Sequence, residues 1–378
     1  MPTHYTRIVL NERPPGDIDS KTFRSEKVPY SKVKVGDDQV LVQVTWLSLD
    51  PAMRGWLRVR PVMLVTSTSL SLAQDERSYL PPVQIGETMR AGGLGVVVDK
   101  GKNVNFKIGQ LVSGSETFIL NQKLLLILHA CAGTFGWTEY AIVNGKDAEP
   151  IDTPQGLLEI DYLNNLGMAG LTAYFGLKDI GQVKAGETLV VSGAAGAVGS
   201  MVCQLGLRAG AKVYAIAGSQ DKCEWLEKEI GVTKAINYKG PSFRQDFREI
   251  GYLDVYFDNV GGDILDMCLS RLNRNARIVL CGAISAYNSV GKPKGIQNYL
   301  TLISQRAKIQ GFIVFDYVKR YPEAIAEISQ GLRDGSIKRK FHIVEGLENA
   351  PSALPLLFSG GNTGKLVVKV AEPLQTKL

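Results

Sequence analysis

The segment Val190–Ser200, VVSGAAGAVGS, joins an apolar run to three glycines and then to helix-forming residues. A β-branched apolar run is typical of a strand buried on both faces of a parallel sheet. Gly193, Gly196 and Gly199 follow at a spacing of three, which permits a tight turn with backbone open to an anion. A helix predicted over Val198–Ala209 would direct the positive end of its dipole at that turn. The segment therefore predicts a phosphate-binding turn between a strand and a helix.

The glycine spacing is G-x-x-G-x-x-G rather than the usual dinucleotide fingerprint, so the motif alone also fits a plain tight connection. The residues that follow favour the dinucleotide interpretation. The helix ends at Ala209-Gly210, and a second strand is predicted over Lys212–Ala217, which completes a βαβ unit of ordinary length. We therefore predict a dinucleotide-binding site.

The end of the second strand indicates which dinucleotide is bound. An NAD site carries an acidic residue there for the adenosine ribose, whereas this chain has GSQDK over 218–222. Ser219 and Lys222 stand where a 2′-phosphate would lie, which predicts NADPH rather than NADH. Asp221 weakens the argument, because it and Lys222 also fit the start of a solvated helix.

Composition sets the broad class of the protein. The 378 residues are 45% hydrophobic and 21% charged, as in two soluble globular domains. The net charge of +6 is spread along the chain without a basic run, which argues against nucleic-acid binding. The N-terminus lacks the apolar region of a signal peptide, and the most apolar short run, Lys123–Ala132, is too short to cross a bilayer. We expect a cytoplasmic protein that binds no membrane.

The possible metal ligands are few. His4, His129 and His342 are not clustered with cysteines or carboxylates at ligand spacing. The five cysteines form no C-x-x-C pair and are typical of reduced thiols. We predict no metal site, so a group other than zinc must stabilise negative charge in any reaction.

The secondary-structure pattern predicts an α/β protein in which a six-stranded, doubly wound parallel sheet is joined to a β-rich domain. The first domain is predicted over 149–325, and the second is formed by 1–148 and 326–378. The six parallel strands are expected at Thr188–Ser192, Lys212–Ala217, Ala235–Asn237, Leu253–Asp258, Ala276–Cys281 and Lys308–Val314. In the β-rich domain, strands are expected at Val40–Leu47, Gly95–Val98 and Gln110–Val112. A helix at about 322–334 precedes a last strand, 364–370, which we expect to return to the β-rich domain.

Eight short motifs, in order along nearly the whole chain, carry a family resemblance. They are Asp50-Pro51-x-Met53-Arg54, Leu166-Gly167-Met168-x-Gly170-Leu171-Thr172-Ala173-Tyr174, the glycine turn 193–199, Ile236-Asn237-Tyr238-Lys239, Tyr256-Phe257-Asp258-Asn259-Val260-Gly261-Gly262, Cys281-Gly282-Ala283-Ile284-Ser285-x-Tyr287-Asn288, Gln310-Gly311-Phe312 and Gly361-Asn362-x-Gly364-Lys365. Together they resemble the zinc-free medium-chain dehydrogenase/reductase superfamily, and within it the alkenal double-bond reductase and prostaglandin reductase branch. The resemblance implies a Rossmann NADP-binding domain, a GroES-like catalytic domain and a homodimer.

The resemblance also implies a set of NADPH-binding residues. Ser219, Lys222 and Tyr238 would hold the 2′-phosphate, in agreement with the polar residues noted above. The pyrophosphate, ribose and nicotinamide would be contacted by Thr172, Ala195, Gly196, Ala197, Val198, Asn259, Cys281, Gly282, Ile284, Tyr287, Phe312, Val314 and Asn362. Taken singly, several have ordinary structural explanations, such as a core position for Cys281 or a helix cap for Asn259.

The reaction implied by the resemblance is hydride transfer from NADPH to the β-carbon of an α,β-unsaturated carbonyl compound. Negative charge then moves to the carbonyl oxygen, which a hydrogen-bond donor must meet. Tyr287 is the candidate catalytic residue, because a phenol donates a hydrogen bond and stays protonated at neutral pH. The cofactor ribose 2′-hydroxyl would share this role, and solvent would supply the α-carbon proton. Ala52, Met53 and Tyr287 would face the substrate.

The motif around Ala52 departs from the family pattern. The resembling enzymes often carry tyrosine between the proline and the methionine of Asp-Pro-x-Met-Arg. A smaller side chain leaves more room and removes one phenol. Either the substrate is bulkier than a simple alkenal, or Tyr287 acts alone.

Two segments, 61–74 and 118–134, interrupt an otherwise continuous pattern. They fit lid loops over a substrate cleft, because long loops are often functional. They also fit translated remnants of unspliced introns, which the cost of exposing a leucine-rich loop favours slightly.

Two other functions remain open at this level. One is a zinc-free quinone reductase, and the other is an NADPH-binding protein that has lost catalysis, for which Ala52 is the support. The strand predicted over Lys308–Val314 is apolar and is expected at a sheet edge, where a second copy of the chain would cover its unpaired backbone groups.

Overall fold

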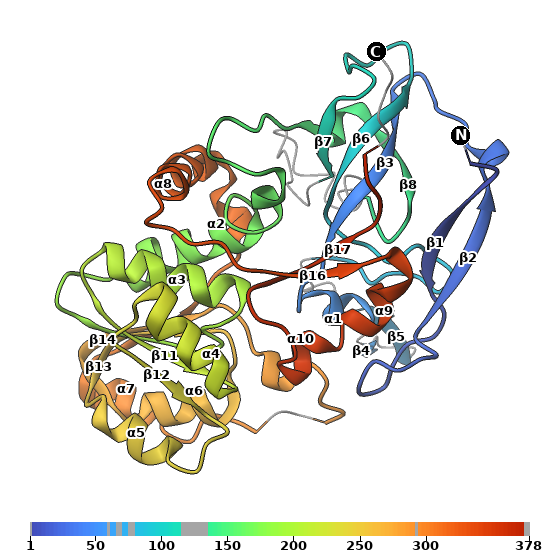
Figure 1. Ribbon diagram of the computed structural model, residues 1–378. Helices are drawn as coiled ribbons and strands as arrows, with labels where there is room; N and C mark the ends of the chain where they lie inside the picture. Colours follow the sequence, from blue (N-terminus) through green and yellow to red (C-terminus); the bar gives the residue numbers. More distant parts are fainter. Residues whose placement is uncertain are drawn as a thin grey trace. The chain divides into compact units, whose positions relative to one another are not determined.

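The computed structural model describes residues 2–58, 80–114, 135–291 and 294–373, together with the backbone of 61–65 and 70–74. Contacts divide the chain into two compact units, which are described one at a time. The β-rich unit comprises Met1–Ile151, Val344–Pro355 and Val368–Leu378, and the parallel-sheet unit comprises Asp152–Ile343 and Leu356–Val367 (Figure 1).

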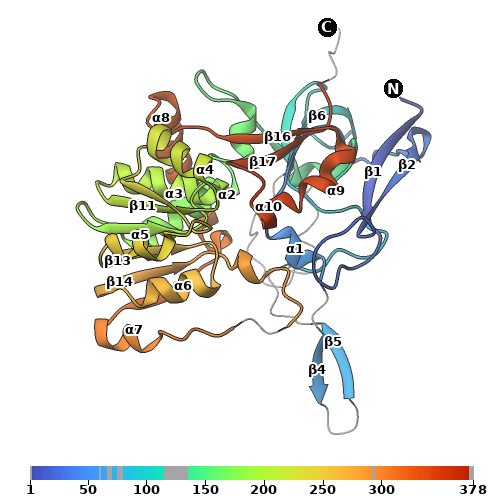
Figure 2. The same cartoon turned by 60° about the horizontal axis from the view of Figure 1, so that its bottom comes forward.

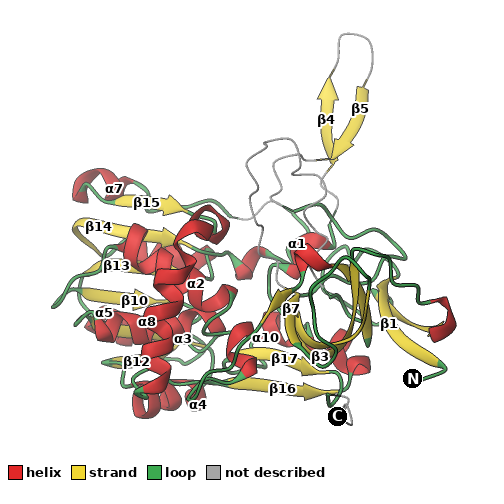
Figure 3. Cartoon of the chain, turned by 90° about the horizontal axis from the view of Figure 1, so that it is seen from above, coloured by secondary structure: helices red, strands yellow, loops and turns green. Residues whose placement is uncertain are grey.

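The parallel-sheet unit contains a six-stranded sheet in the order β12-β11-β10-β13-β14-β15 (Figure 3). The strands are β10 (Thr188–Val191), β11 (Lys212–Ala217), β12 (Lys234–Asn237), β13 (Leu253–Asp258), β14 (Leu272–Leu280) and β15 (Lys308–Gly311). All five neighbouring pairs are parallel. The strand order reverses between β10 and β13, which is the doubly wound arrangement that creates a crevice at the carboxyl ends of the strands. The predicted fold class is confirmed.

The sheet is covered on both faces, because neighbouring residues of one strand belong to different hydrophobic cores. On β10, Leu189 and Val191 lie in one core and Val190 lies in the other. The first core draws on α2 (Met168–Phe175), α3 (Ala197–Arg208), α4 (Gln220–Trp225) and α8 (Tyr321–Arg333), and the second draws on α5 (Phe243–Glu249), α6 (Gly262–Leu269) and α7 (Leu300–Gln305). Burial on both faces explains why the central strands β10, β11 and β13 are mainly apolar in the sequence.

The glycine turn joins β10 to α3 as the sequence predicts. Gly193 has a φ of +57°, a conformation that favours glycine. A Cβ atom added at Gly199 would lie 2.3 Å from the carbonyl oxygen of Gly193. The helix therefore starts directly against the turn only because position 199 has no side chain.

The β-rich unit contains most of a seven-stranded sheet in the order β16-β17-β3-β6-β7-β9, with β8 also paired to β3. Its strands are β3 (Gln39–Ser48), β6 (Gly93–Lys100), β7 (Leu111–Gly114), β8 (Tyr140–Asn144), β9 (Glu149–Pro150), β16 (Phe341–Glu345) and β17 (Lys365–Lys369), and a separate hairpin pairs β1 (His4–Leu10) with β2 (Phe23–Pro29). The three predicted strands of this region appear as β3, β6 and β7. β17 lies beside β3, so the predicted return of the C-terminal strand is also confirmed.

The two doubtful segments are only partly described. β4 (Pro61–Val65) and β5 (Leu70–Gln74) pair as an antiparallel hairpin in which Pro61 is opposite Gln74 (Figure 2). Residues 66–69 and 118–134 lie outside the described residues. The choice between loops and translated introns therefore stays as the sequence leaves it.

The unit bounds differ from the predicted domain bounds near the C-terminus. Residues on α8, including Ile328, share a hydrophobic core with Phe175 of α2, so this helix counts with the parallel-sheet unit. Residues 356–367 join the same unit, since the N–H of Gly364 donates to the carbonyl oxygen of Ala195 at 2.7 Å. Where the independently folding domains begin and end stays a prediction.

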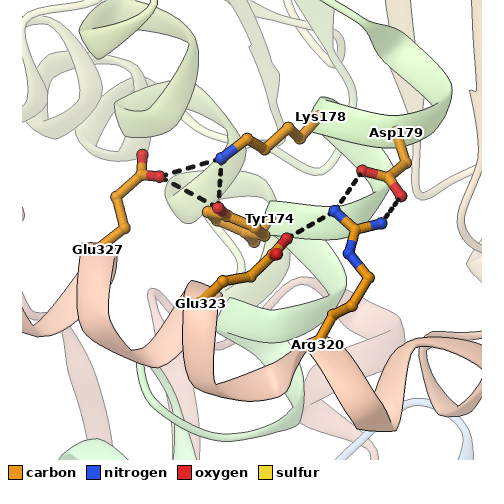
Figure 4. Close-up of polar contacts among 6 residues, drawn as sticks. All are labelled: Tyr174, Lys178, Asp179, Arg320, Glu323 and Glu327. Atoms are coloured by element: carbon orange, nitrogen blue, oxygen red, sulfur yellow. Dashed lines mark hydrogen bonds and ion pairs between the residues drawn. The ribbon is translucent and has the colours of Figure 1, made fainter.

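Polar side chains reinforce the contact between α2 and α8 (Figure 4). The hydroxyl of Tyr174 donates to Glu327 at 3.1 Å and accepts from Lys178, whose ammonium lies 3.2 Å from the same carboxylate. Arg320 pairs with Asp179 beside them, and its guanidinium lies 5.1 Å from the centre of the Phe175 ring. Exposed ion pairs contribute little singly, but here the charges lie on buried aromatic rings. The network therefore fixes the two helices against each other.

α8 spans 13 residues. In the part of the chain that the structure describes, no helix is both long and apolar enough to cross a membrane.

Candidate active site

A pocket of about 600 Å³ lies at the carboxyl ends of β13, β14 and β15, within the parallel-sheet unit. It is lined by Asp258, Gly261, Leu265, Leu280, Cys281, Gly282, Ala283, Tyr287, Gly311, Phe312, Ile313 and Asp316. Pockets of this size and place in a doubly wound sheet commonly hold small molecules.

The turn after β13 is organised by a fully buried carboxylate. Asp258 is 0% exposed, and its Oδ1 accepts hydrogen bonds from the Ser192 hydroxyl at 2.9 Å and the Tyr256 hydroxyl at 2.7 Å. The backbone N–H groups of Val260 and Gly261 donate to the same oxygen at 3.0 Å. These bonds hold the turn in a single conformation, with Gly261 at a φ of +71°.

The turn after β14 is tied to the turn after β13. The N–H groups of Cys281 and Gly282 donate to the carbonyl oxygen of Asp258 at 2.9 and 3.1 Å. The Ser285 hydroxyl donates to the carbonyl oxygen of Val260 at 2.6 Å. The two turns are therefore linked directly, and the second one positions Tyr287.

Tyr287 lines the pocket, and its hydroxyl is held by one hydrogen bond. The phenol oxygen accepts a hydrogen bond from the N–H of Ala283 at 3.2 Å, so its own O–H can donate elsewhere. Burial raises the pKa of Tyr287, and the charge of Asp258 adds to the shift, whereas the Ala283 N–H opposes it. The phenol therefore stays protonated at neutral pH. Burial likewise raises the pKa of the neighbouring Cys281 thiol to about 12.

Phe312 forms another wall of the pocket. Its ring lies edge-on to Phe257 and to Tyr317, with ring centroids 6.5 Å apart in each pair. A Cβ atom at Gly176 would lie 2.5 Å from the Phe312 ring, so this glycine makes room for the ring. The side chain of Val314, two residues later, is buried in the core.

The glycine turn has the features of an anion site. Gly196 caps α3, and Ala197 and Val198 form its first turn, where backbone N–H groups have no partner within a helix. Ala195 is buried and accepts the Gly364 bond described above. Asn362 lies in the same segment as Gly364, where its Nδ2 donates to the Gly364 carbonyl oxygen at 3.0 Å. The structure thus brings the turn and the segment around Asn362 together.

The predicted 2′-phosphate residues lie at the carboxyl ends of β11 and β12. Lys222 is 8% exposed, and its ammonium donates to the carbonyl oxygen of Gly360 at 2.7 Å. Burial lowers the pKa of Lys222, while the nearby Asp221 raises it. Ser219 precedes α4, and its hydrogen bond to Asp221 lowers the pKa of that carboxyl.

Tyr238 follows β12 and contacts the turn after β11. Its backbone N–H donates to the carbonyl oxygen of Ala217 at 2.9 Å. A Cβ atom added at Gly218 would lie 3.0 Å from its ring. Tyr238 therefore lies beside the residues of the Ser219 turn, as a shared binding role requires.

The other predicted site residues lie on several different elements. Asn259 ties β13 to β10, since its Nδ2 donates to the carbonyl oxygen of Ser192 at 2.7 Å. Ile284 begins the short helix after β14, and Thr172 lies within α2. Ala52 and Met53 belong to the β-rich unit, where Met53 is buried at the start of the short helix α1 (Met53–Trp56). The binding role of each residue stays a prediction.

The sequence interpretation missed Asp258 as a site residue. The available signal was a carboxylate that ends an apolar strand, in Tyr256-Phe257-Asp258, and is followed by glycines.

Within the described residues, no three His, Cys, Asp or Glu side chains are grouped closely enough to hold a metal ion. His129 and Cys131 lie outside the described residues.

Two family models match the chain. The model described as "Zinc-binding dehydrogenase" matches residues 197–330, and the model described as "N-terminal domain of oxidoreductase" matches residues 6–118. The first covers most of the parallel-sheet unit, from the start of α3 through the residues that line the pocket.

Similar proteins extend these matches over nearly the whole chain. A putative NADP-dependent oxidoreductase, YfmJ of Bacillus subtilis, is 38% identical over 99% of this chain and 100% of its own length. A 2-alkenal reductase (NADP(+)-dependent) of Nicotiana tabacum is 33% identical over 90% of each chain. The crystal structure of CurA from Vibrio vulnificus in complex with NADPH has a TM-score of 0.82 and 35% identity, and the match covers 97% of this chain and 100% of that chain.

The order of the motifs, the doubly wound sheet and these matches agree with one another. The chain belongs to the zinc-free medium-chain dehydrogenase/reductase superfamily, in its alkenal double-bond reductase branch.

Proposed function

We propose that the protein is an NADPH-dependent reductase that transfers hydride to the β-carbon of α,β-unsaturated carbonyl compounds. The observation that carries this proposal is the Tyr287 hydroxyl, which lines the pocket and accepts a hydrogen bond from the Ala283 N–H. The NADPH complex of CurA and the activity named for the tobacco 2-alkenal reductase support it.

The residues present fit NADPH. The glycine turn leaves no room for a side chain at position 199, which keeps the helix N-terminus open to a pyrophosphate. Lys222, Ser219 and Tyr238 form a polar group at the ends of β11 and β12, where a 2′-phosphate would be held. Cys281, Gly282 and Phe312 line the pocket that would take the nicotinamide end.

When bound, NADPH supplies a hydride to the substrate. The task of the chain is to stabilise the negative charge that then develops on the substrate carbonyl oxygen. Tyr287 donates its O–H to that oxygen, since the bond that it accepts from the Ala283 N–H leaves the O–H available. A preorganised donor of this kind typically contributes a factor of about 10² to 10³ in rate. The α-carbon proton comes from solvent.

We also propose that the protein is a homodimer. β15 is the last strand of the sheet order, so one side of its backbone is unpaired within the sheet. The adjacent α7 exposes Leu300 by 62% and Ile303 by 71%. A second copy pairing edge to edge would cover both the strand and these side chains.

The substrate class is tested by incubating the protein with NADPH and an enal, an enone or a quinone in parallel. We expect NADPH to be oxidised with the enal and the enone, and mass spectrometry to find products with a saturated carbon–carbon bond. Oxidation by the quinone alone would replace this proposal with a quinone reductase. No oxidation with any substrate would indicate a cofactor-binding protein without catalysis.

The role of Tyr287 is tested by Tyr287→Phe. The variant keeps the ring but loses the donor, so we expect kcat to fall by about 10² to 10³ while NADPH binding changes little. The raised pKa also predicts that wild-type kcat shows no loss from phenol ionisation below pH 10. Tyr252→Phe, an exposed tyrosine outside the pocket, is the matched control. Equal losses in the two variants would rule out Tyr287 as the donor.

The role of Lys222 is tested by Lys222→Gln. Loss of a charge-assisted bond to the 2′-phosphate should weaken NADPH binding by about tenfold to a hundredfold and leave NADH binding nearly unchanged. Fluorescence titration measures both affinities. Lys228→Gln, an exposed lysine six residues later, should change neither. A parallel weakening of NADPH and NADH by Lys222→Gln would contradict a 2′-phosphate contact.

The dimer surface is tested by Ile303→Lys. A buried lysine without a partner is costly, so light scattering should find a dimer for the wild-type protein and a monomer for the variant. Ile108→Lys alters an apolar side chain of the β-rich unit that is 50% exposed, and it should leave the dimer intact. A wild-type protein that is monomeric at micromolar concentration would disprove the proposal.

A further inference from the structure

Asp258 is a buried carboxylate without a cationic partner among the described residues. It is 0% exposed and borders the pocket. Burying an isolated charge is costly, and buried carboxylates are usually paired with a cation. A charge held in this way at a pocket needs a functional explanation.

The groups around Asp258 all donate hydrogen bonds to its carboxylate. Its Oδ1 accepts from the hydroxyls of Ser192 and Tyr256 and from the N–H groups of Val260 and Gly261. Oδ2 accepts a longer bond of 3.1 Å from the same Gly261 N–H. The two backbone groups can only donate, and the Ser192 hydroxyl already accepts from the N–H of Asn259 at 2.9 Å. An acceptor-only carboxylate suits these donors, since a protonated one would need an acceptor for its own proton.

The negative charge of Asp258 acts on the groups that line the pocket. After burial, it raises the pKa of Cys281, and it adds to the raised pKa of Tyr287 as a smaller cause than burial and Cys281. The other carboxylate of the pocket wall, Asp316, is exposed to solvent, which screens its charge. Asp258 is therefore the one buried carboxylate among the residues that line the pocket.

We propose that Asp258 makes the pocket favour a cationic nicotinamide ring over a neutral one. This inference rests on the proposed function, because it assumes that the nicotinamide end of NADPH occupies the pocket. Hydride transfer moves two electrons and one proton from the ring to the substrate, so the ring gains one positive charge. The negative charge gained by the substrate oxygen is neutralised when solvent protonates the product. A buried carboxylate beside the ring favours the oxidised state, which makes bound NADPH a stronger reductant.

Asp258→Asn removes the charge and keeps the hydrogen bonds to Oδ1, at a cost in stability because the buried amide N–H groups lack an acceptor among the described residues. In Asp258→Asn, the amide oxygen can take the place of Oδ1 and keep all four donors. The amide nitrogen then takes the place of Oδ2, where the described residues supply only the longer bond that Gly261 shares. Tyr256→Phe is the matched control, because it removes one donor and keeps the charge.

The first measurement is the affinity of each protein for NADP⁺ and for NADPH by fluorescence titration. In Asp258→Asn, the ratio of the NADP⁺ Kd to the NADPH Kd should rise by about fivefold to tenfold. In Tyr256→Phe, the ratio should stay the same or fall, since the charge remains and is less neutralised. An unchanged ratio in Asp258→Asn, or a raised ratio in Tyr256→Phe, would overturn the inference.

The second measurement needs no cofactor. Iodoacetamide modifies thiolates, and peptide mass spectrometry follows the modification at Cys281 alone. Without the carboxylate, the Cys281 thiol should ionise more readily, so its alkylation at pH 9 should be several times faster in Asp258→Asn than in the wild type. Circular dichroism checks that the variant is folded.

The two measurements separate the inference from the function it rests on. If neither the wild type nor the variant binds NADPH, the proposed function fails, whereas faster alkylation of Cys281 would still identify the charge of Asp258 in the pocket. If both bind NADPH and the affinity ratio is the same, the function stands and the inference fails. If Asp258→Asn does not fold, the ratio measured for Tyr256→Phe decides, because a rise would contradict a fixed negative charge.

Discussion

The hydrogen bonds to the Asp258 carboxylate are the interaction on which the rest of the candidate site depends. They join β10, through Ser192, to the turn after β13. The backbone of Asp258 then receives the N–H groups of Cys281 and Gly282 from the turn after β14. Tyr287 owes its place in the pocket to this chain of contacts. One buried acceptor thus organises the carboxyl ends of three adjacent strands.

Much of the fold follows from the sequence, because its strongest signals are local. The central strands β10, β11 and β13 are mainly apolar because both faces of the sheet are buried there. The glycine turn is recognisable because a Cβ atom at position 199 would collide with the carbonyl oxygen of Gly193. The sequence predictions agree less well with the structure where contacts between distant segments determine where an element ends or against which core it packs. The strand expected over Lys308–Val314 ends at Gly311, and Val314 belongs to the helical segment that follows. Ile328 on α8 packs on the core of the parallel-sheet unit, although the sequence order favours the other domain.

The candidate site is predictable by residue type but not by contact. Tyr287 and Lys222 are named from motifs alone. The motifs do not indicate that the phenol accepts from Ala283, four residues before it, or that the ammonium bonds to Gly360, 138 residues away. Asp258 has a local signal, as a carboxylate that ends an apolar strand before glycines, but its partner Ser192 is distant in the sequence. Ser192 lies 66 residues before it, and only the adjacency of β10 and β13 brings the two side chains together.

The charges of the parallel-sheet unit form a pattern. Lys222 places a positive charge at the ends of β11 and β12, and Asp258 places a negative charge at the end of β13. The strand order sets these two positions apart, with β10 and the glycine turn between them. A dinucleotide with a phosphate on one ribose and a positive charge on the opposite ring matches this arrangement from end to end. The nicotinamide ring of NADPH is neutral and gains the second interaction only when it has given up its hydride. The positive charge of Lys222 therefore favours cofactor binding, and the negative charge of Asp258 favours reduction of the substrate.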